Sequence, residues 1–532
     1  MRQAWFDPTV NKNDSKHYDA IVVGSGIGGL TTAGLLCVAG YSVLVLEQHD
    51  RPGGYAHGFR RKRYHFDSAV HLISGCGPDG YDGGQIIHKT LSCLGVRKDI
   101  DFIRVDPLAV AAYPGFCATV PQTSRAFLQA MRVRFPSEFE NLKKFITLCL
   151  DIARQASAGD EILFRSASRG ELPVLLKYRR STLAEVCGEY IRDSKLIAIL
   201  TANWPYLGLP PSRVSFVYWS TMFIGYLEDG ACYCRGGFQR LADTLVDGLK
   251  RHGGNIRFKS RVDRICVQNN QVRGVVLRDG RKYSASRVVA NADMHGTVYE
   301  LIGRENFPKR FLDRMERLKS SLSIFAVYLA TDLDLTKFTL RHESFCYANF
   351  DHEKNYADSC AGKVTWIGIS IPSLTDSTLC PAGQHLILLT TLVPFEIDAS
   401  WKKAKTAYIS EMLDIAERHL PGLGKHLLYV EGGSPKTMER YTGNHRGAAY
   451  GWDLSPDQVG PSRIANRSPI EGLFFAGHWT TPGGGVYGAA VSGVHTTKQI
   501  LNISNFCEFW SRLESKSHCT TTGIDTQYVL RS

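Results

Sequence analysis

The chain has 532 residues, of which 44% are hydrophobic and 21% are charged, and its formal net charge is +12. A chain of this length and composition buries a large core and divides into two lobes, which excludes a fibrous or disordered protein. A run of about 18 apolar residues is missing, which argues against a transmembrane helix. The basic clusters are short and show no recurrent basic–aromatic pattern, so we expect no nucleic-acid partner.

The first 17 residues are expected to form a loosely ordered leader, because they lack the apolar core and the cleavage site of a signal peptide and do not resemble a transit peptide. The 14 Cys residues are scattered along the chain. Without Cys/His ligand spacing, they predict reduced thiols and no metal site.

The most specific pattern begins at residue 18. An apolar run over 20–23 predicts a buried parallel strand, and the glycine-rich turn that follows leads into a helix. A second apolar strand ends at Glu47, about 20 residues further on. Glycines at this spacing allow a tight turn and a close approach of pyrophosphate to the helix N-terminus, and the acid accepts hydrogen bonds from ribose. The complete unit predicts a bound dinucleotide. The alternative is a glycine-rich turn with a purely structural role.

A second glycine pair, Gly53-Gly54, comes soon after the acid, and residues 58–71 read as extended chain passing close to a flat cofactor. The alternative for this segment is an exposed loop. Asp67 and His71 lie four residues apart, which places them on one side of an extended chain. They are our candidate catalytic pair at the cofactor edge, with Glu228, Asp229 and His478 as further acid or base candidates. For His71, a hydrogen-bonded core residue is the alternative.

Residues 76–235 carry helix-like periodicity and include the apolar, aromatic segment 206–227. That segment has two interpretations. It forms either a membrane-dipping collar around a substrate mouth or a buried helical hairpin, with the second slightly favoured.

Residues 236–295 return to alternating elements, with a helix over 238–249 and strands over 255–259, 262–267, 272–277 and 287–292. Residues 296–434 predict further strands at 324–329 and 385–393. These would form a sheet below a pocket, which we expect to include some of the following aromatic side chains: Phe345, Tyr347, Trp366 and Phe395.

The first pattern is repeated near the C-terminus. It consists there of a strand over 473–476, the turn Gly477-His478, the glycine triplet 483–485 and a helix over 487–500. The N-terminus of that helix would stabilise a reduced, anionic flavin. Residues 503–532 are expected to be loosely ordered, as a helix fragment followed by disorder.

Five segments together resemble the phytoene desaturase, carotenoid isomerase and retinol saturase group of the FAD-dependent amine-oxidase-like superfamily. They are 18–30, 51–59, 64–67, 439–452 and 472–478. The resemblance covers about residues 18–502. It implies an α/β fold with a discontinuous Rossmann-type FAD-binding lobe (18–75, 236–295 and 435–502) and a substrate lobe (76–235 and 296–434) with helices on a mixed sheet. In much of the superfamily an Asp stands at the position of His478, so the contact made by that carboxylate does not carry over.

The motifs and the resemblance together assign cofactor-binding roles to the glycines, to the ribose acid and its neighbours, and to the middle and C-terminal segments. These residues are Gly24, Gly26, Ile27, Gly28, Gly29, Glu47, Gln48, Arg51, Gly53, Gly54, Val262, Ala290, Asn291, Gly477, His478, Gly485 and Val486.

The resemblance implies an FAD-dependent oxidoreductase that desaturates, saturates or isomerises C=C bonds of a long hydrophobic polyene. Two alternatives are a flavin amine oxidase on a soluble substrate and a non-catalytic prenyl-binding protein similar to the GDP-dissociation inhibitors. The latter lack the C-terminal flavin turn that is present here. A polyene substrate implies peripheral membrane contact, on the cytoplasmic side or in a plastid. The basic charge fits attraction to anionic lipid or an ordinary solvated surface.

Overall fold

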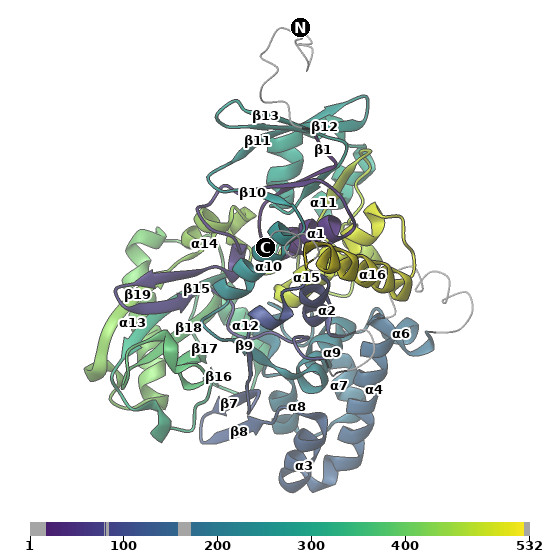
Figure 1. Cartoon of the computed structure of the whole chain (residues 1–532). Helices are drawn as coiled ribbons and strands as arrows, with labels where there is room; N and C mark the ends of the chain where they lie inside the picture. The colour runs from purple at the N-terminus through teal and green to yellow at the C-terminus, as the bar shows by residue number, and fades with distance from the viewer. Residues whose placement is uncertain (1–16, 79, 81–83, 158–171, 526–532) are drawn as a thin grey trace.

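The computed structural model describes residues 17–78, 80, 84–157 and 172–525, with side chains described as far as Ser517. The expected leader therefore lies outside the described residues except for His17. Figure 1 shows a lobe that contains β10–β13 above a second lobe, in which a sheet stands beside a bundle of helices.

The first lobe is built around a five-stranded parallel sheet whose strands come from four separate parts of the chain. Its order is β10 (Asn255–Arg257), β3 (Val43–Leu46), β2 (Ala20–Val23), β14 (Val288–Ala290) and β20 (Leu473–Phe475). Every residue of β2, β3, β14 and β20 is buried, as expected for apolar strands covered on both faces. The discontinuous Rossmann-type lobe predicted from the sequence is confirmed.

A second sheet of four strands lies next to this one: β1 (His17–Tyr18), β13 (Lys282–Ala285), β12 (Gln271–Leu277) and β11 (Val262–Gln268). The predicted helix after residue 236 is α10 (Gln239–Arg251).

The second lobe contains a seven-stranded sheet, in which β16 pairs with β7 in parallel and the other neighbours are antiparallel. Its order is β19 (Leu427–Gly433), β15 (Ser323–Thr331), β18 (His385–Val393), β17 (Trp366–Ser370), β16 (Glu343–Tyr347), β7 (Ala109–Tyr113) and β8 (Phe116–Val120). The predicted mixed sheet is confirmed. Helix α13 (Trp401–His419) packs on one face, and side chains of the other face join the largest apolar core.

Helices form the rest of this lobe: α3 (Ser124–Arg134), α4 (Phe139–Ser157), α7 (Leu183–Tyr190), α8 (Ser194–Thr201) and α9 (Phe216–Ile224), which continues into a π-helix (Gly225–Gly230). Within 206–227, Phe216, Trp219 and Phe223 are almost completely buried. The collar reading is therefore wrong, because these side chains pack inside the lobe and form no apolar surface. The favoured alternative, a buried helical hairpin, is correct about burial, but the described chain there forms one helix, α9 with its π-helical continuation, and no hairpin.

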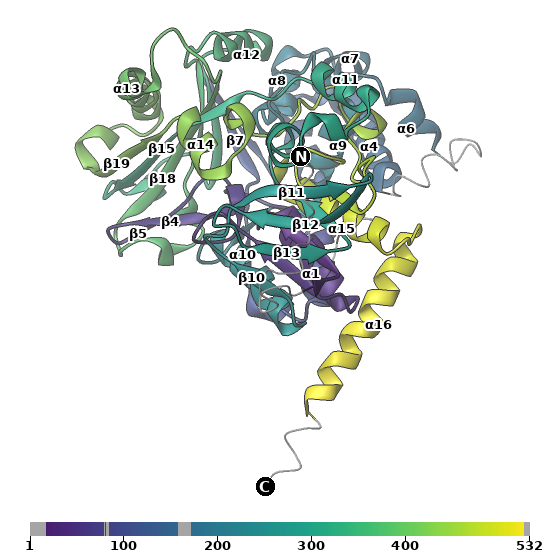
Figure 2. The same cartoon turned by 90° about the horizontal axis from the view of Figure 1, so that it is seen from above.

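The tail is more ordered than expected. Helix α16 (Phe506–Asp525) packs against α1 (Ile27–Val38) and α2 (Ile86–Cys93), and buries Phe509 and Leu513 completely. Its far end extends away from the body of the molecule (Figure 2). The helix fragment expected in this tail is therefore present, and it is packed more firmly over 506–517 than expected, because its apolar face contacts α1 and α2. Residues 526–532 lie outside the described part.

Candidate functional site

The glycine-rich turn between β2 and α1 is closely packed on both sides. A Cβ on Gly24, which has φ +94°, would lie 2.3 Å from the Asn291 carbonyl oxygen, and a Cβ on Gly28 would lie 2.8 Å from the Gly477 nitrogen. The Asn291 side-chain amide donates to the Gly24 carbonyl at 3.3 Å. The structure therefore brings the N-terminal, middle and C-terminal cofactor segments into direct contact, as predicted.

Two helix N-termini are open at this turn. Helix α1 begins after Gly26 and α15 (Gly485–Ile500) begins after Gly484, and neither start has a side-chain cap or an acidic residue in its first turn. The two helices pack directly, since a Cβ on Gly493 of α15 would lie 2.5 Å from the Gly28 carbonyl. Uncapped N–H groups at a helix start favour anions, so this region suits a pyrophosphate and an electron-rich ring edge.

Glu47 lies at the end of β3 and is bound to the turn. Its carboxylate accepts hydrogen bonds from the Ser25 amide at 2.8 Å, the Ser25 hydroxyl at 2.7 Å and the His49 amide at 2.8 Å. A carboxylate has about four acceptor positions, so one remains for a ribose hydroxyl. The Gly53–Gly54 turn lies directly alongside, with Gly53 bridged to Gly26, and Val262 begins a strand just after Ser260, whose amide donates to the Glu47 carbonyl.

Two of the predicted cofactor residues are engaged with protein groups, and a third is exposed. The Arg51 guanidinium binds Asp50 and the Gly58 carbonyl, and Gln48 is exposed. His478 shares the Asn444 side-chain oxygen with Trp479. Burial, assisted by the nearby Arg463 charge, lowers the pKa of His478 to about 3. This imidazole is neutral at physiological pH and offers no substitute for a carboxylate.

The structure contains a buried cation that the sequence did not reveal. Arg463 is 1% exposed and donates to backbone carbonyls of both 450–458 and 478–480. Its acceptors are Tyr450, Trp452, Asp453, Gln458, His478 and Thr480. This side chain therefore fixes the loop that precedes α15, and no local motif marks it.

The predicted pairing of Asp67 with His71 is wrong. Asp67 ends β5 (Tyr64–Asp67) and accepts from the Tyr233 hydroxyl at 2.5 Å and the Phe238 amide at 2.7 Å, so it supports the start of α10. His71 instead lies 3.1 Å from the Ser370 hydroxyl and 3.4 Å from the Glu343 carboxyl. The chain leaves the strand at Asp67, so the alternation that would align the two side chains is lost.

The support role of Asp67 gives a pH-dependent prediction. Burial raises its pKa to about 6, so the folded protein holds this proton more tightly than the unfolded chain. That stabilisation is present below the unfolded pKa of about 4 and is lost as the pH rises through about 6, a change of about 3 kcal/mol. Asp67→Asn should remove this part of the pH dependence of the free energy of unfolding, measured by urea denaturation. The exposed Asp101→Asn control should keep it, and equal slopes in all three proteins would contradict the assignment.

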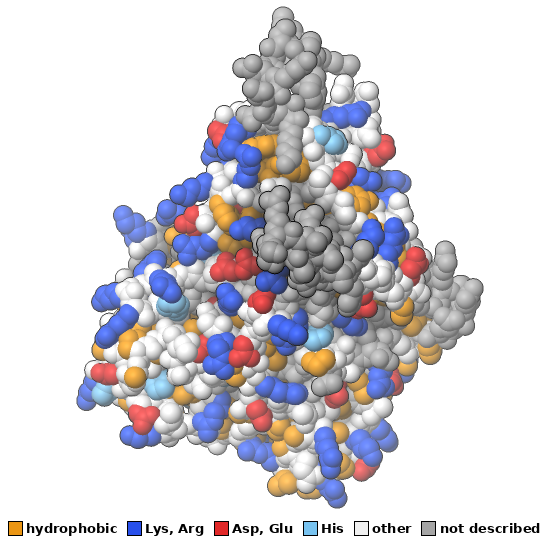
Figure 3. Space-filling model, viewed as in Figure 1, with side chains coloured by type: hydrophobic (Ala, Val, Ile, Leu, Met, Phe, Trp, Pro, Cys, Tyr) orange, Lys and Arg blue, Asp and Glu red, His pale blue; other side chains and the backbone are white. Residues whose placement is uncertain are grey.

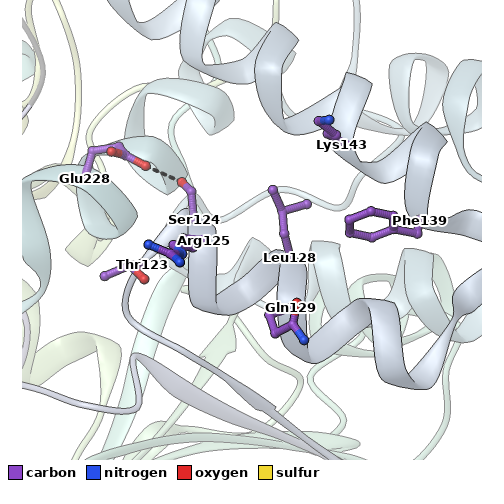
Figure 4. Close-up of a pocket in the computed structure, with 8 residues that line it drawn as sticks. All are labelled: Thr123, Ser124, Arg125, Leu128, Gln129, Phe139, Lys143 and Glu228. Atoms are coloured by element: carbon purple, nitrogen blue, oxygen red, sulfur yellow. Dashed lines mark hydrogen bonds between the residues drawn. The ribbon is translucent and has the colours of Figure 1, made fainter.

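The other acid or base candidates lie elsewhere. Glu228 is hydrogen-bonded to Ser124 and lines a surface cleft of about 510 Å³ between α3, α4 and the π-helix (Figure 4). Arg125 and Lys143 give this cleft charged walls. Asp229 is buried against the backbone of Gly84.

A small enclosed cavity of about 20 Å³ lies inside the second lobe, and most of its lining is apolar. Tyr206, Tyr226 and Phe345 contribute aromatic walls. Of the four aromatic residues predicted for a pocket, only Phe345 lines this cavity. Tyr347 stacks on Tyr113, Trp366 packs on Trp204, and Phe395 lies beneath Lys436.

The family model for flavin-containing amine oxidoreductases matches residues 27–501, which covers both lobes. The chain belongs to this family. The dinucleotide cradle described above identifies the flavin as FAD, since the glycine turn, the ribose acid and the two open helix starts fit that molecule. Among the described residues, this flavoprotein has no cluster of three or more potential metal ligands and no helix long and apolar enough to cross a membrane.

Curated relatives of this flavoprotein share both lobes. It is 27% identical to the chloroplastic prolycopene isomerase of Daucus carota, over 92% of this chain and 80% of that one. It is 25% identical to the all-trans-retinol 13,14-reductase of Danio rerio, over 86% and 82% of the two chains. It is also 25% identical to the lycopene-forming phytoene desaturase of Pseudescherichia vulneris, over 90% and 98%.

Solved structures share the fold of this flavoprotein. An oxidoreductase from Methanosarcina mazei has a TM-score of 0.62 at 17% identity, covering 92% of this chain and 100% of that one. A putrescine oxidase variant has the same TM-score at 15% identity and the same coverage. A RAB GDI from Plasmodium falciparum has a TM-score of 0.52 at 12% identity, again over 92% and 100%.

Proposed function

We propose that this FAD oxidoreductase acts on a long hydrophobic polyene of carotenoid or retinoid type, by desaturation, saturation or isomerisation of C=C bonds. The observation that carries this proposal is the similarity, over 86–92% of the chain, to three enzymes whose names specify such substrates. Because the similarity spans the substrate lobe as well as the cofactor lobe, it concerns more than the shared cofactor.

The interior of the substrate lobe supports an uncharged substrate. Burial lowers the pKa of His71 to about 3 and raises that of Glu343 to about 8, so both are mainly neutral near pH 7. Tyr206 and Tyr226, at the cavity wall, are also neutral because burial raises their pKa values. An amine substrate would bring a positive charge into this apolar space, where burying an unpaired charge is costly.

The bound flavin would accept or supply a hydride, or cycle through its reduced form. The protein residues would hold the two molecules together and exclude water. Tyr450 links the two lobes here, since its hydroxyl donates to the Pro205 carbonyl at 2.7 Å and its β-carbon packs beside Gly484 at the start of α15.

The test is product analysis with the FAD-loaded protein. Oxidised and chemically reduced samples are incubated without oxygen with a panel of carotenoids and retinoids, and separately with putrescine and other amines, and the products are separated by chromatography. We expect conversion of at least one polyene and of no amine. Amine oxidation without polyene conversion would overturn the proposal and support the amine oxidase alternative.

Peripheral membrane association, on the cytoplasmic side or in a plastid, is part of the same proposal because polyenes partition into bilayers. Lys and Arg side chains are spread over the face in Figure 3 among acidic and apolar ones. Flotation with liposomes that contain anionic lipid tests the association. Recovery of all the protein in the dense fraction at low salt would contradict it.

A further inference from the structure

A cluster of polar side chains is buried between the seven-stranded sheet of the second lobe and the segment that follows β5. Glu343 and Ser370 face each other across β16 and β17, and the Ser370 hydroxyl donates to the Glu343 carboxyl at 2.8 Å. His71 comes from the segment that follows β5. Its Nδ1 lies 3.1 Å from the Ser370 hydroxyl and 3.4 Å from the Glu343 carboxyl. Glu343 is 1% exposed, so an acidic side chain has been placed deep in an apolar lobe.

This cluster retains unused hydrogen-bonding capacity. The second carboxyl oxygen of Glu343 and the hydroxyl of Tyr206 are both buried, and neither makes a well-aligned hydrogen bond to the described residues. The Tyr206 hydroxyl nevertheless lies close enough to Glu343 to lower the pKa of that carboxyl. Because unsatisfied buried polar atoms are costly and these two are neighbours, the Tyr206 hydroxyl and this Glu343 oxygen are placed to share a hydrogen bond and to exchange a proton.

The cluster adjoins the small, mainly apolar cavity of the second lobe. Tyr206 lines the cavity, and its ring packs edge-on against His71 at 5.8 Å and against Phe345 at 5.2 Å between ring centres. Phe345 is two residues from Glu343 on the same strand, so both project from the same face of the sheet. Pro205, next to Tyr206, accepts the Tyr450 hydroxyl that connects this wall to the flavin turn.

We propose that Tyr206 is the catalytic residue that gives a proton to the polyene, and that Glu343 resupplies this proton while Ser370 and His71 hold the Glu343 carboxyl in position. This inference rests on the proposed function and narrows it to the reductive direction, the saturation of a C=C bond.

The atoms and electrons of this step balance. One alkene carbon would receive a hydride, with its electron pair, which the reduced flavin would supply when bound. The neighbouring carbon receives the proton of the Tyr206 hydroxyl, and the Glu343 O–H bond breaks as the tyrosine O–H bond re-forms. Glu343 is left as a carboxylate and is reprotonated from solvent after product release. The reductant is the two-electron-reduced flavin.

The protonation state supports a donor role. The titratable groups on the side of Glu343 are His71 from the loop after β5, Tyr206 from the turn at 204–206, Tyr226 from the π-helix, and Tyr347 from its own strand. All are neutral near pH 7, so no facing cation favours the carboxylate. Burial raises the pKa of Glu343 to about 8, while the Ser370 hydrogen bond opposes this rise.

The test is the pH profile of polyene reduction in reduced FAD-loaded protein. The wild-type rate should be constant at low pH and fall as the pH passes through about 8. Glu343→Gln and Tyr206→Phe should each be slowed by roughly 10²-fold, the lower end of a general acid contribution, and Glu343→Gln should also lose the fall near pH 8. Ser370→Ala should be slowed less than Glu343→Gln and should move the midpoint upward, because the hydrogen bond it removes positions the Glu343 carboxyl and favours the carboxylate.

The control and a second readout make the test decisive. Glu228→Gln, a surface change in the neighbouring π-helix, should match wild type. Infrared spectra of the substrate-free protein should show a protonated carboxyl band at pH 7 that is missing from Glu343→Gln and weakens above pH 8. A Glu343→Gln protein that binds FAD and keeps the wild-type rate and midpoint would overturn the relay alone. Flavin-loaded wild type that converts no polyene would overturn the proposed function, and the relay with it.

Discussion

Gly24→Ala is expected to bind FAD more weakly while the protein still folds. The new methyl group would lie 2.3 Å from the Asn291 carbonyl oxygen, so the turn or β14 must shift, and positive φ adds strain. We expect FAD binding to weaken by at least about tenfold, which corresponds to 1.4 kcal/mol, and the unfolding free energy to fall by about 1–3 kcal/mol from overpacking. Flavin fluorescence titration of the cofactor-free protein measures the first, and urea denaturation the second.

Gly40→Ala is the matched control for this substitution. Gly40 has φ +95°, almost the same as Gly24, but its added Cβ would meet no atom within 4 Å. It should therefore lose about 1 kcal/mol of stability through backbone strain alone and bind FAD as tightly as wild type. Equal FAD affinity in the two variants would show that the contact with Asn291 does not shape the cofactor site.

Arg463→Met should produce the largest loss of stability. The substitution keeps a long apolar side chain but leaves buried carbonyls of the 450–458 and 478–480 segments without their donor. Each unsatisfied buried acceptor costs about 1–3 kcal/mol, so we expect a loss of at least about 3 kcal/mol in the free energy of unfolding, measured by urea denaturation in the cofactor-free protein.

Arg467→Met provides the comparison, because Arg467 is exposed and lies on the same segment. It should change the unfolding free energy by no more than about 0.5 kcal/mol. If Arg463→Met were equally mild, the loop before α15 would be held by other contacts, and the central role given to the buried guanidinium would be wrong.

The cofactor lobe was predictable because its signals are local. Each element of the first unit, from the strand at 20–23 to Glu47, lies within 30 residues, and every one needs a particular residue type for a stated physical reason. Asn291 and Gly477 were also assigned to the cofactor region from their motifs, although the contact between them, with a Cβ on Gly477 lying 2.7 Å from the Asn291 side-chain oxygen, required the fold.

The substrate lobe was harder because its key partners are distant in sequence. Glu343 lies in an ordinary strand, and its neighbours His71 and Tyr206 are more than 100 residues away, so no spacing reveals the cluster. Arg463 is similar, since its acceptors are backbone carbonyls, which leave no mark on the sequence. For Asp67, the deciding partner was Tyr233, which the fold brings across from β9 (Cys232–Cys234).

An FAD enzyme for polyenes should reveal itself in an anaerobic absorption spectrum of the purified protein during titration with single carotenoids and retinoids. The cofactor released by denaturation is identified in the same samples. We expect released FAD, and flavin bands that change with one polyene in proportion to the amount added. A protein without flavin bands that takes up no added FAD, or one whose flavin responds to amines alone, would contradict this assignment.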